Sequence, residues 1–309
     1  MINIDQKQFP RSSVFIGELE SLNDRFIVAQ IKTMLNNFGD EYVTFLEKVL
    51  FLANTSKVSP VDSILDYTTV FLREQVRFQQ TDSYSHESFD EVYDEVYNNP
   101  DVMEGFYLDG LLLTQACWEI HYHIHRFFCN HFLPRCKGKA QGLEIGFGHG
   151  LYLYEILQQC QNKGWARCVI YGLDISEYSL KYATRLLKQS FSEDLFILKI
   201  GDIQNELNFP EQSMEFGLMA EVIEHIHSPD QALLRMRHCL KSDSPLYVVT
   251  PMNSNAVDHI TNFQSIDEIE KLIISTGFVL ETKEVFSVKQ FQPESKDRTE
   301  TLCAVFRAL

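Results

Sequence analysis

Residues 143–150 read Leu-Glu-Ile-Gly-Phe-Gly-His-Gly, an apolar run that passes through three alternating glycines into a helical segment. Glycine allows a tight turn and a close approach of a ligand to the backbone. In the dinucleotide fingerprint G-x-G-x-x-G the third glycine comes one residue later, and here an acid, Glu144, precedes the first glycine. A carboxylate at this point suits a ligand with an ammonium group better than one with a pyrophosphate. The stretch therefore predicts a ligand-binding turn between a strand and a helix.

Two more acids follow at corresponding places along the chain. Asp174 ends the apolar run VIYGLD, and Asp202 stands in KIGDI after the next run. Open α/β sheets bind ligands at the carboxyl ends of their strands, where we expect all three acids to meet. Asp174 could accept hydrogen bonds from both ribose hydroxyls of a nucleoside, and Asp202 one from an adenine amino group. Each acid alone could instead cap a helix, but together with the glycines they favour a nucleoside site.

The chain around these motifs alternates short apolar runs with helical segments. We predict strands at 142–146, 168–173, 195–200, 214–220, 246–250, 279–286 and 301–307, and helices at 151–161, 177–189, 204–207 and 230–240. Such alternation is typical of βαβ units in a parallel sheet that is covered on both faces. The last two strands are expected to pair antiparallel at one edge.

The preceding part of the chain is helical by pattern. Apolar residues recur at helical spacing in 18–38, 40–54 and 63–78, and the aromatic segment 105–133 reads as a buried helix. Segment 54–62 reads as a loop, and the acidic stretch 81–109 as a solvated face or a mobile lid over a substrate cleft. Pro134, Gly138 and Gly142 mark a boundary. We therefore predict an all-α domain at 1–138, which covers the substrate or forms a dimer surface, and an α/β domain at 139–309.

Composition narrows the class of partner. The formal charge is −16, from 27 basic and 43 acidic side chains, which disfavours DNA, RNA and anionic membranes. The seven cysteines show no C-x-x-C spacing and are expected to be reduced thiols rather than disulfides or a zinc site. The N-terminus lacks a signal-peptide pattern, and no apolar run reaches the roughly 20 residues of a membrane span. These features predict a cytoplasmic protein.

The motifs together resemble those of class I S-adenosylmethionine (SAM) dependent methyltransferases. The matching pieces are LEIGFGHG, YGLDIS, GDI, and FGLMAEVIEHI followed by a helix and LYVVTP. The resemblance implies an α/β, doubly wound, Rossmann-like sheet of seven strands in the order 3-2-1-4-5-7-6. It implies that SAM is the cofactor, with its methionine part, ribose and adenine held by the following residues: Glu144, Gly146, Gly148, Gly150, Asp174, Ile175, Asp202, Ile203 and Glu221.

The end of the fourth predicted strand, Glu221-Val-Ile-Glu224-His225, resembles segments of three methyltransferase groups: ubiquinone-type O-methyltransferases, small-RNA 3′-end methyltransferases and α-keto acid C-methyltransferases. The RNA enzymes imply a divalent metal at Glu221, Glu224, His225 and His259, and these ligand types suit Mg²⁺, Mn²⁺, Fe²⁺ or Zn²⁺. Without a metal, Glu224 and His225 would form a hydrogen-bonded pair, with His225 as general base. Glu221, Glu224 and His225 are therefore the candidate catalytic residues.

A second group of histidines, His121, His123 and His125, lies in the predicted buried helix. One of them could reach the active site, or all three could be polar members of a buried aromatic helix. His149, inside the glycine turn, is given no catalytic role.

The predicted function is methyl transfer from SAM to a small molecule at an oxygen, nitrogen or carbon atom. An α-keto acid and a hydroxylated secondary metabolite are the acceptor classes considered, with or without a metal. The alternatives are an RNA 3′-end methyltransferase, a non-methylating SAM-binding relative, and a binding module in which the helical domain is the active part. A homodimer is also considered.

Overall fold

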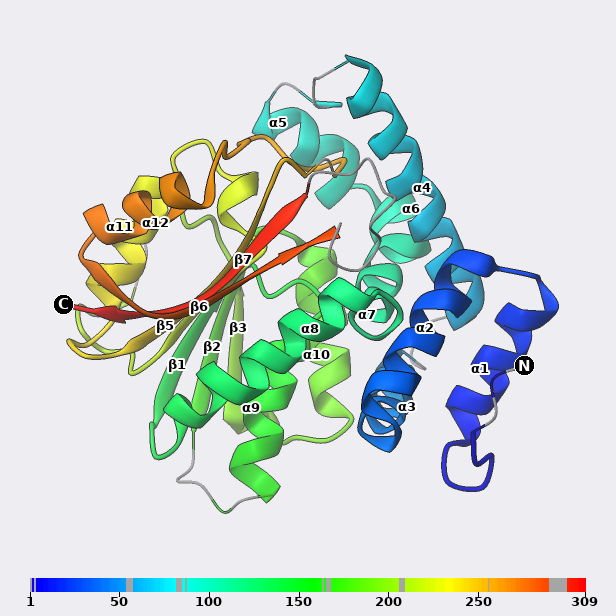
Figure 1. The fold of residues 1–309 in the computed structure, drawn as a ribbon. Coiled ribbons are helices and arrows are strands. Elements are labelled where there is room, and N and C mark those ends of the chain that lie inside the picture. The colour runs from blue at the N-terminus through cyan, green and yellow to red at the C-terminus, as the bar shows by residue number, and fades with distance from the viewer. Residues whose placement is uncertain are drawn as a thin grey trace.

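The computed structural model describes residues 2, 4–53, 58–81, 85–86, 88–162, 164, 168–205, 209–254, 256–288 and 299–309, without the side chain of Gln79. Its strands form one seven-stranded sheet in the order β3-β2-β1-β4-β5-β7-β6, which confirms the predicted fold (Figure 1). The strands are β1 Gln141–Ile145, β2 Val169–Asp174, β3 Phe196–Ile200, β4 Gly217–Ala220, β5 Pro245–Met252, β6 Phe278–Ser287 and β7 Glu300–Ala308.

Strand pairing follows the prediction. β1 pairs parallel with β2 and β4, and the parallel set continues to β3 on one side and to β5 on the other. β7 pairs antiparallel with both β5 and β6, so β6 forms the edge of the sheet. Parallel neighbours need crossover connections, and helices α9 Leu151–Asn162, α10 Glu177–Lys188 and α11 Pro229–Cys239 supply three of them.

Two connections differ from the sequence-based expectation. The predicted helix 204–207 is wrong over its described part, because residues 203–205 form a turn in which the Asp202 carboxylate accepts a hydrogen bond from the Gln204 N–H at 2.8 Å. Residues 206 and 207 lie outside the described part. Helix α12 Ile266–Ser275, between β5 and β6, was not predicted. Ser265 caps it by accepting from the Glu268 N–H.

The helices before the sheet differ in extent from the predicted segments: the helix over 60–81 is longer than the predicted 63–78, whereas 18–38 and 105–133 are each divided. They are α1 Pro10–Ser21, α2 Arg25–Phe38, α3 Asp40–Ala53, α4 Pro60–Thr81, α5 Phe89–Val92, α6 Pro100–Val102, α7 Leu108–Cys117 and α8 Glu119–Phe127. Segment 18–38 breaks because Asn23 is left-handed (φ 56°) and Asp24 caps α2 by accepting from the Ile27 N–H at 2.7 Å. Segment 105–133 breaks where Trp118 is extended (φ −106°, ψ 127°).

π-Helical turns interrupt the helical region before the sheet at Tyr93–Tyr97, Met103–Tyr107 and Phe128–Phe132. Three 3₁₀ turns complete the elements, at Leu133–Cys136, Glu193–Leu195 and Ile223–His225. The last of them lies directly after β4 and carries two of the candidate catalytic residues.

The buried core is continuous across the predicted boundary at residue 138. Rings of Phe128 and Phe132 pack against Tyr247 of β5 at 5.4 Å between centroids. The Tyr247 hydroxyl donates to the backbone carbonyl of Ile124 on α8 at 3.3 Å. The end of the helical region therefore packs directly on the sheet, while α1–α4 gather at the far side of the molecule from the C-terminus (Figure 1). The division into 1–138 and 139–309 stays a prediction.

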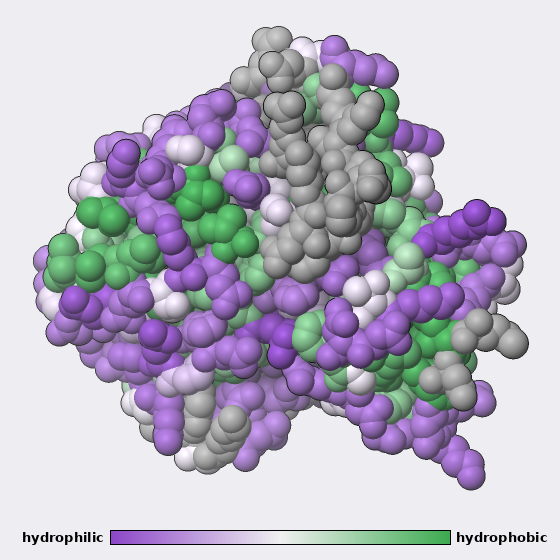
Figure 2. Space-filling model, viewed as in Figure 1, coloured by the Kyte–Doolittle hydropathy of each residue, from purple (hydrophilic) through white to green (hydrophobic). Residues whose placement is uncertain are grey.

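The surface is largely hydrophilic on the face shown in Figure 2, with apolar areas at the C-terminal end of the molecule and beside the first helices. Exposed apolar side chains include Val14 and Leu22 on the N-terminal side and Leu234 and Ile274 on α11 and α12. Among the described residues, no helix combines the length and the apolar character that a membrane crossing requires.

Candidate functional site

The glycine stretch forms a tight turn at the end of β1. Gly146, Gly148 and Gly150 have φ of +65°, +47° and +81°, the left-handed region that L side chains rarely adopt. A Cβ at Gly146 would lie 2.6 Å from Cγ2 of Val222. The Gly148 N–H donates to Asp174 Oδ2 at 2.9 Å, which ties the turn to the end of β2. The glycines are thus required by conformation and, at Gly146, by space.

The three predicted acids line one cavity above the carboxyl ends of β1, β2 and β3. Glu144 is 2% exposed, and within the described structure its Oε2 has no hydrogen-bond partner. Burial, with the nearby charge of Asp174, holds the pKa of Glu144 well above its usual value. Burial also raises the pKa of Asp174, although backbone N–H groups of Ser176 and Gly148 oppose that effect. Both carboxyls would gain from a ligand that donates hydrogen bonds.

The Asp202 carboxylate also accepts hydrogen bonds within the turn that follows β3. Besides the Gln204 N–H, its carboxylate accepts from Asn205 Nδ2 at 3.1 Å. Its side chain still borders the cavity together with Ile175 and Ile203. Of the predicted cofactor residues, Gly150 does not border the cavity. It faces α10, where a Cβ on Gly150 would lie 3.0 Å from Cβ of Ala183. Its role is to turn the chain into α9.

The helical region closes the cavity from above. Side chains of α4, α7 and the turns around them line it opposite the sheet, including Tyr67, Phe71, Tyr97, Tyr107, Leu108, Leu111, Gln115 and Trp118. Leu111 Cδ2 lies 4.0 Å from the position that a Cβ of Gly148 would occupy. The stretch 81–109 has two faces: Asp90 and Glu95 are exposed, while Phe89, Tyr97 and Tyr107 line the cavity. Asp82 and Glu87 lie outside the described residues.

Glu221 stands at the end of β4 in a left-handed backbone conformation (φ 55°) that is uncommon for a non-glycine residue. Its N–H donates to the Val249 carbonyl at 2.8 Å, which holds this conformation in place. The side chain is accessible because it borders the cavity. Because protein surrounds that cavity, burial raises the pKa of Glu221 and outweighs the opposing charge of His225.

Three of the four predicted metal ligands lie together. One ligand atom each of Glu224, His225 and His259 falls within 4.8 Å of the others. His225 Nδ1 lies 2.7 Å from the Asp258 carbonyl, and His259 Nδ1 lies 3.1 Å from the Ser254 carbonyl. Each Nδ1 must therefore be the donor, and Nε2 carries the lone pair. Glu221 is not part of this group of three.

Glu224 is fully buried, and its two oxygens differ. Oε2 accepts a hydrogen bond from the Thr250 hydroxyl at 2.9 Å. Oε1 has no hydrogen-bond partner in the described structure and lies 3.8 Å from His225 Nε2. That distance is too long for the predicted hydrogen-bonded pair. Burial and the charge of Glu221 hold the pKa of Glu224 well above its usual value.

Asp258 and Tyr97 were not predicted as site residues from the sequence. Asp258 is 2% exposed, and its Oδ2 accepts from the Tyr97 hydroxyl at 2.9 Å and from the Tyr107 hydroxyl at 2.5 Å. Burial alone would raise the pKa of Asp258, but His225, His259 and these hydroxyls lower it. The only available signal was its position beside His259, because the tyrosines come from a segment more than a hundred residues earlier.

The three helical histidines separate. His121 lines the cavity, with Nδ1 at 2.9 Å from the Thr114 hydroxyl, and burial lowers its pKa to about 4. His149 lines the same cavity and accepts from the Leu151 N–H at 3.1 Å. His123 packs against Phe286 of β6, and His125 lies in a buried polar network. His121 thus reaches the cavity, which agrees with the alternative that one of the three histidines would do so.

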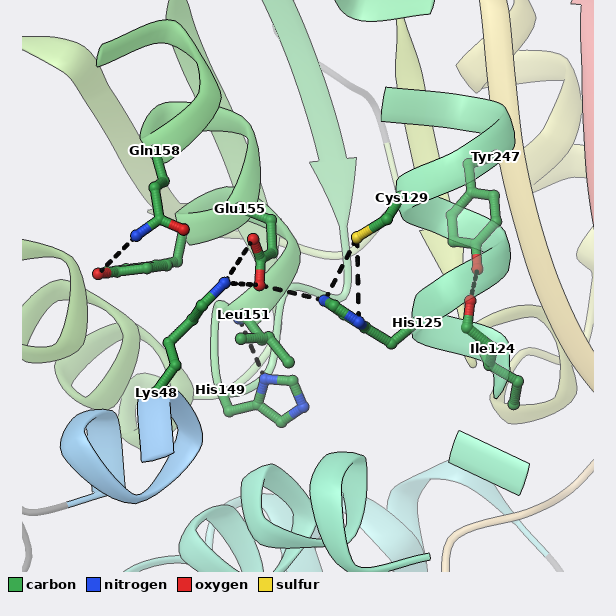
Figure 3. Close-up of polar contacts among 10 residues, drawn as sticks. Lys48, Ile124, His125, Cys129, His149, Leu151, Glu155, Gln158 and Tyr247 are labelled. Carbon is green, nitrogen blue, oxygen red and sulfur yellow. Dashed lines mark hydrogen bonds and ion pairs between the residues drawn. The ribbon is translucent and has the colours of Figure 1, made fainter. Parts of the chain in front are cut away.

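The network around His125 joins α3, α8 and α9 (Figure 3). Lys48 Nζ lies 2.8 Å from Glu155 Oε1, and His125 Nε2 lies 3.1 Å from the same oxygen. Cys129 Sγ lies 3.6 Å from His125 Nε2. Glu155 is on the helix that follows the glycine turn, so the network anchors that helix to the helical region.

Comparison with known proteins bears on the family of the sheet domain. Residues 143–248 match the family model described as a methyltransferase domain. This match confirms the resemblance to SAM-dependent methyltransferases that the motifs indicated. Among curated proteins, none matches the sequence.

Solved structures that the chain is similar to include the 4+2 cyclase SpnF, at 13% identity and a TM-score of 0.48 over 63% of this chain and 82% of that one. Another is a protein from Galdieria sulphuraria provisionally named a sarcosine dimethylglycine methyltransferase, at 15% identity and a TM-score of 0.49 over 63% and 86%. A SAM-dependent methyltransferase from Methanosarcina mazei shares 13% identity, with a TM-score of 0.44 over 57% and 96%. Such distant similarities carry no information on the acceptor.

Proposed function

We propose that this protein transfers the methyl group of SAM to a small-molecule acceptor held between the sheet and the helical region. The observation that carries the proposal is the meeting of the glycine turn, Glu144 and Asp174 in one cavity that also contains Glu221 and His225. In the proposed arrangement Glu144 and the turn face the methionine part of SAM, Asp174 with Ile175 faces the ribose, and Asp202 with Ile203 faces the adenine.

Methyl transfer is an in-line displacement. A lone pair on the acceptor atom attacks the methyl carbon, the carbon–sulfur bond breaks, and sulfur keeps the electron pair as the thioether of S-adenosylhomocysteine (SAH). The protein's main contribution is to align the two reactants in the cavity. In the metal-free form an acceptor that must lose a proton needs a base, and we assign that role to His225 Nε2, because Nδ1 is turned to the Asp258 carbonyl.

The test is cofactor binding followed by turnover. SAH should bind in calorimetry, and SAM should be converted to SAH in the presence of a pool of small metabolites. A methylated product of increased mass should form together with SAH. SAH binding without any methylated product would favour the non-methylating alternative, and no binding of SAM or SAH would contradict the proposal as a whole.

We also propose that Glu224, His225 and His259 hold a divalent metal. The donor set fits, because one ligand atom each of Glu224, His225 and His259 lies within 4.8 Å of the others, and Glu224 Oε1 is buried without a hydrogen-bond partner among the described residues. A bound metal would orient acceptor oxygens and acidify a bound hydroxyl. Zn²⁺ and Mn²⁺ titration of the metal-free protein should show one site that His259→Ala removes. His238→Ala is the matched control, since His238 lies on α11 away from the cavity.

An RNA acceptor is less favoured by the same cavity. Its described lining residues include no lysine or arginine, whereas RNA-binding surfaces rely on such side chains to neutralise phosphates. Retention of a labelled small RNA on filters, weakening with salt, would support the RNA alternative over a small molecule.

A further inference from the structure

The cavity has an unbalanced charge. Its described lining contains five carboxylates, those of Glu144, Asp174, Asp202, Glu221 and Asp258, and neither lysine nor arginine. Four histidines also line it; His121 Nδ1 lies 2.9 Å from the Thr114 hydroxyl, and His149 Nδ1 accepts a hydrogen bond from the Leu151 N–H. The proposed cofactor arrangement uses the first three acids, which leaves Glu221 and Asp258 for the acceptor.

Aromatic rings face these two acids from the helical region. The Trp118 ring lies 4.7 Å from Phe71 and 5.8 Å from Tyr67, and Tyr67 lies 5.8 Å from Tyr107, between ring centroids. Tyr67, Glu221 and Asp258 all line the cavity. A group bound between Tyr67 and Glu221 would contact ring faces and a carboxylate together.

Two polar side chains in the same wall lack partners. Gln115 is 8% exposed and Trp118 6% exposed, and both line the cavity. Gln115 Oε1 and Trp118 Nε1 have no hydrogen-bond partner among the described residues. The end of α7 at Cys117 and the extended backbone of Trp118 place them in this wall. A buried polar atom without a partner is costly, so an occupant that supplies hydrogen bonds would be held in a fixed orientation.

We infer that the acceptor-binding part of the cavity, defined by Tyr67, Gln115, Trp118 and Glu221, recognises an amine carried on a flat apolar body. This inference rests on the proposed function. A protonated amine is attracted both by aromatic ring faces and by carboxylates, and its N–H groups suit Gln115 Oε1. A carboxylate ligand such as an α-keto acid would meet Glu221 and Asp258 with no cationic side chain among the described lining residues to balance it.

A matched series of probes tests this inference. Tyramine, tyrosol and 4-hydroxyphenylacetate share one ring and differ in carrying an amine, a hydroxyl or a carboxylate. Each is titrated into SAH-saturated protein in EDTA by calorimetry. We expect tyramine to bind at least tenfold more tightly than 4-hydroxyphenylacetate, with tyrosol between them. Equal or tighter binding of the carboxylate, or binding of none of the three at millimolar concentration, overturns the inference.

Two variants separate the amine site from general damage. Glu221→Gln should reduce the preference for tyramine over tyrosol by about tenfold when each is titrated at an SAH concentration that saturates the variant. Glu18→Gln makes the same change on the exposed face of α1 and should leave the preference unchanged. An unchanged preference in Glu221→Gln contradicts the inference. SAH binding is measured first, because its loss in the wild-type protein would contradict the proposed function, whereas SAH binding without an amine preference contradicts only this inference.

Discussion

Glu155→Gln should destabilise the protein by a large and pH-dependent amount. Glu155 is the shared partner of Lys48 and His125, and the side chains of Glu155 and His125 are only 3% and 7% exposed. Burial alone would raise the pKa of Glu155, but His125 and Lys48 outweigh it and lower the pKa from 4.5 to about 2. At about 1.4 kcal/mol for each pH unit, this corresponds to roughly 3 kcal/mol of stabilisation. The glutamine would leave the buried His125 and the partly buried Lys48 without their counter-charge.

The pH dependence follows from both partners. Burial would lower the pKa of His125, but Cys129 and Glu155 raise it from 6.5 to about 9. A raised histidine pKa contributes stability that is complete below 6.5 and is lost as pH rises through about 9. The lowered Glu155 pKa contributes stability that is complete above 4.5 and is lost as pH falls through about 2. The two shifts describe one interaction, so the pair contributes fully between pH 4.5 and 6.5.

Urea denaturation of the wild type and Glu155→Gln measures this effect. Within that pH window the variant should lose about 3 kcal/mol of unfolding free energy, and the difference should shrink above pH 9. Glu177→Gln breaks the exposed pair with Lys181 and should lose less than about 1 kcal/mol. The reasoning is refuted if Glu155→Gln loses no more unfolding free energy than this control, or loses the same amount between pH 4.5 and 6.5 as above pH 9.

Three further predictions concern the cavity. Asp174→Ala should weaken SAH binding in calorimetry roughly ten- to hundredfold, since hydrogen bonds to a charged group contribute about 1.5–3 kcal/mol; unchanged affinity would remove the ribose assignment. Gly146→Ala should lower the free energy of unfolding by about 1–3 kcal/mol more than Gly138→Ala. Both glycines have positive φ, but only at Gly146 would the added Cβ clash, 2.6 Å from Val222 Cγ2. Equal losses in the two variants would contradict the steric argument. Tyr107→Phe should lose about 1–3 kcal/mol in urea denaturation because the buried Asp258 loses a donor, while Tyr93→Phe, outside the cavity lining, should be nearly neutral.

Local pattern was sufficient for most of the sheet domain. The glycine turn, Glu144 and Asp174 could be found because each needs only a strand, a turn and a following helix within a short segment. The order of the sheet came from the family resemblance, and the structure confirms it. The breaks at Asn23 and Trp118 were missed, because apolar spacing continues through both positions and the competing capping and turn contacts are local details that spacing does not report.

The sequence by itself determined that Glu144, Asp174 and Asp202 would meet, because they lie at the ends of consecutive strands, which a parallel sheet brings to one edge. Only the tertiary structure decided which residues complete the cavity. Asp258 meets Tyr97 and Tyr107, and His259 meets Glu224 and His225, because distant segments pack together over the sheet. Such contacts depend on the path of the chain in space, which residue spacing along one segment does not encode.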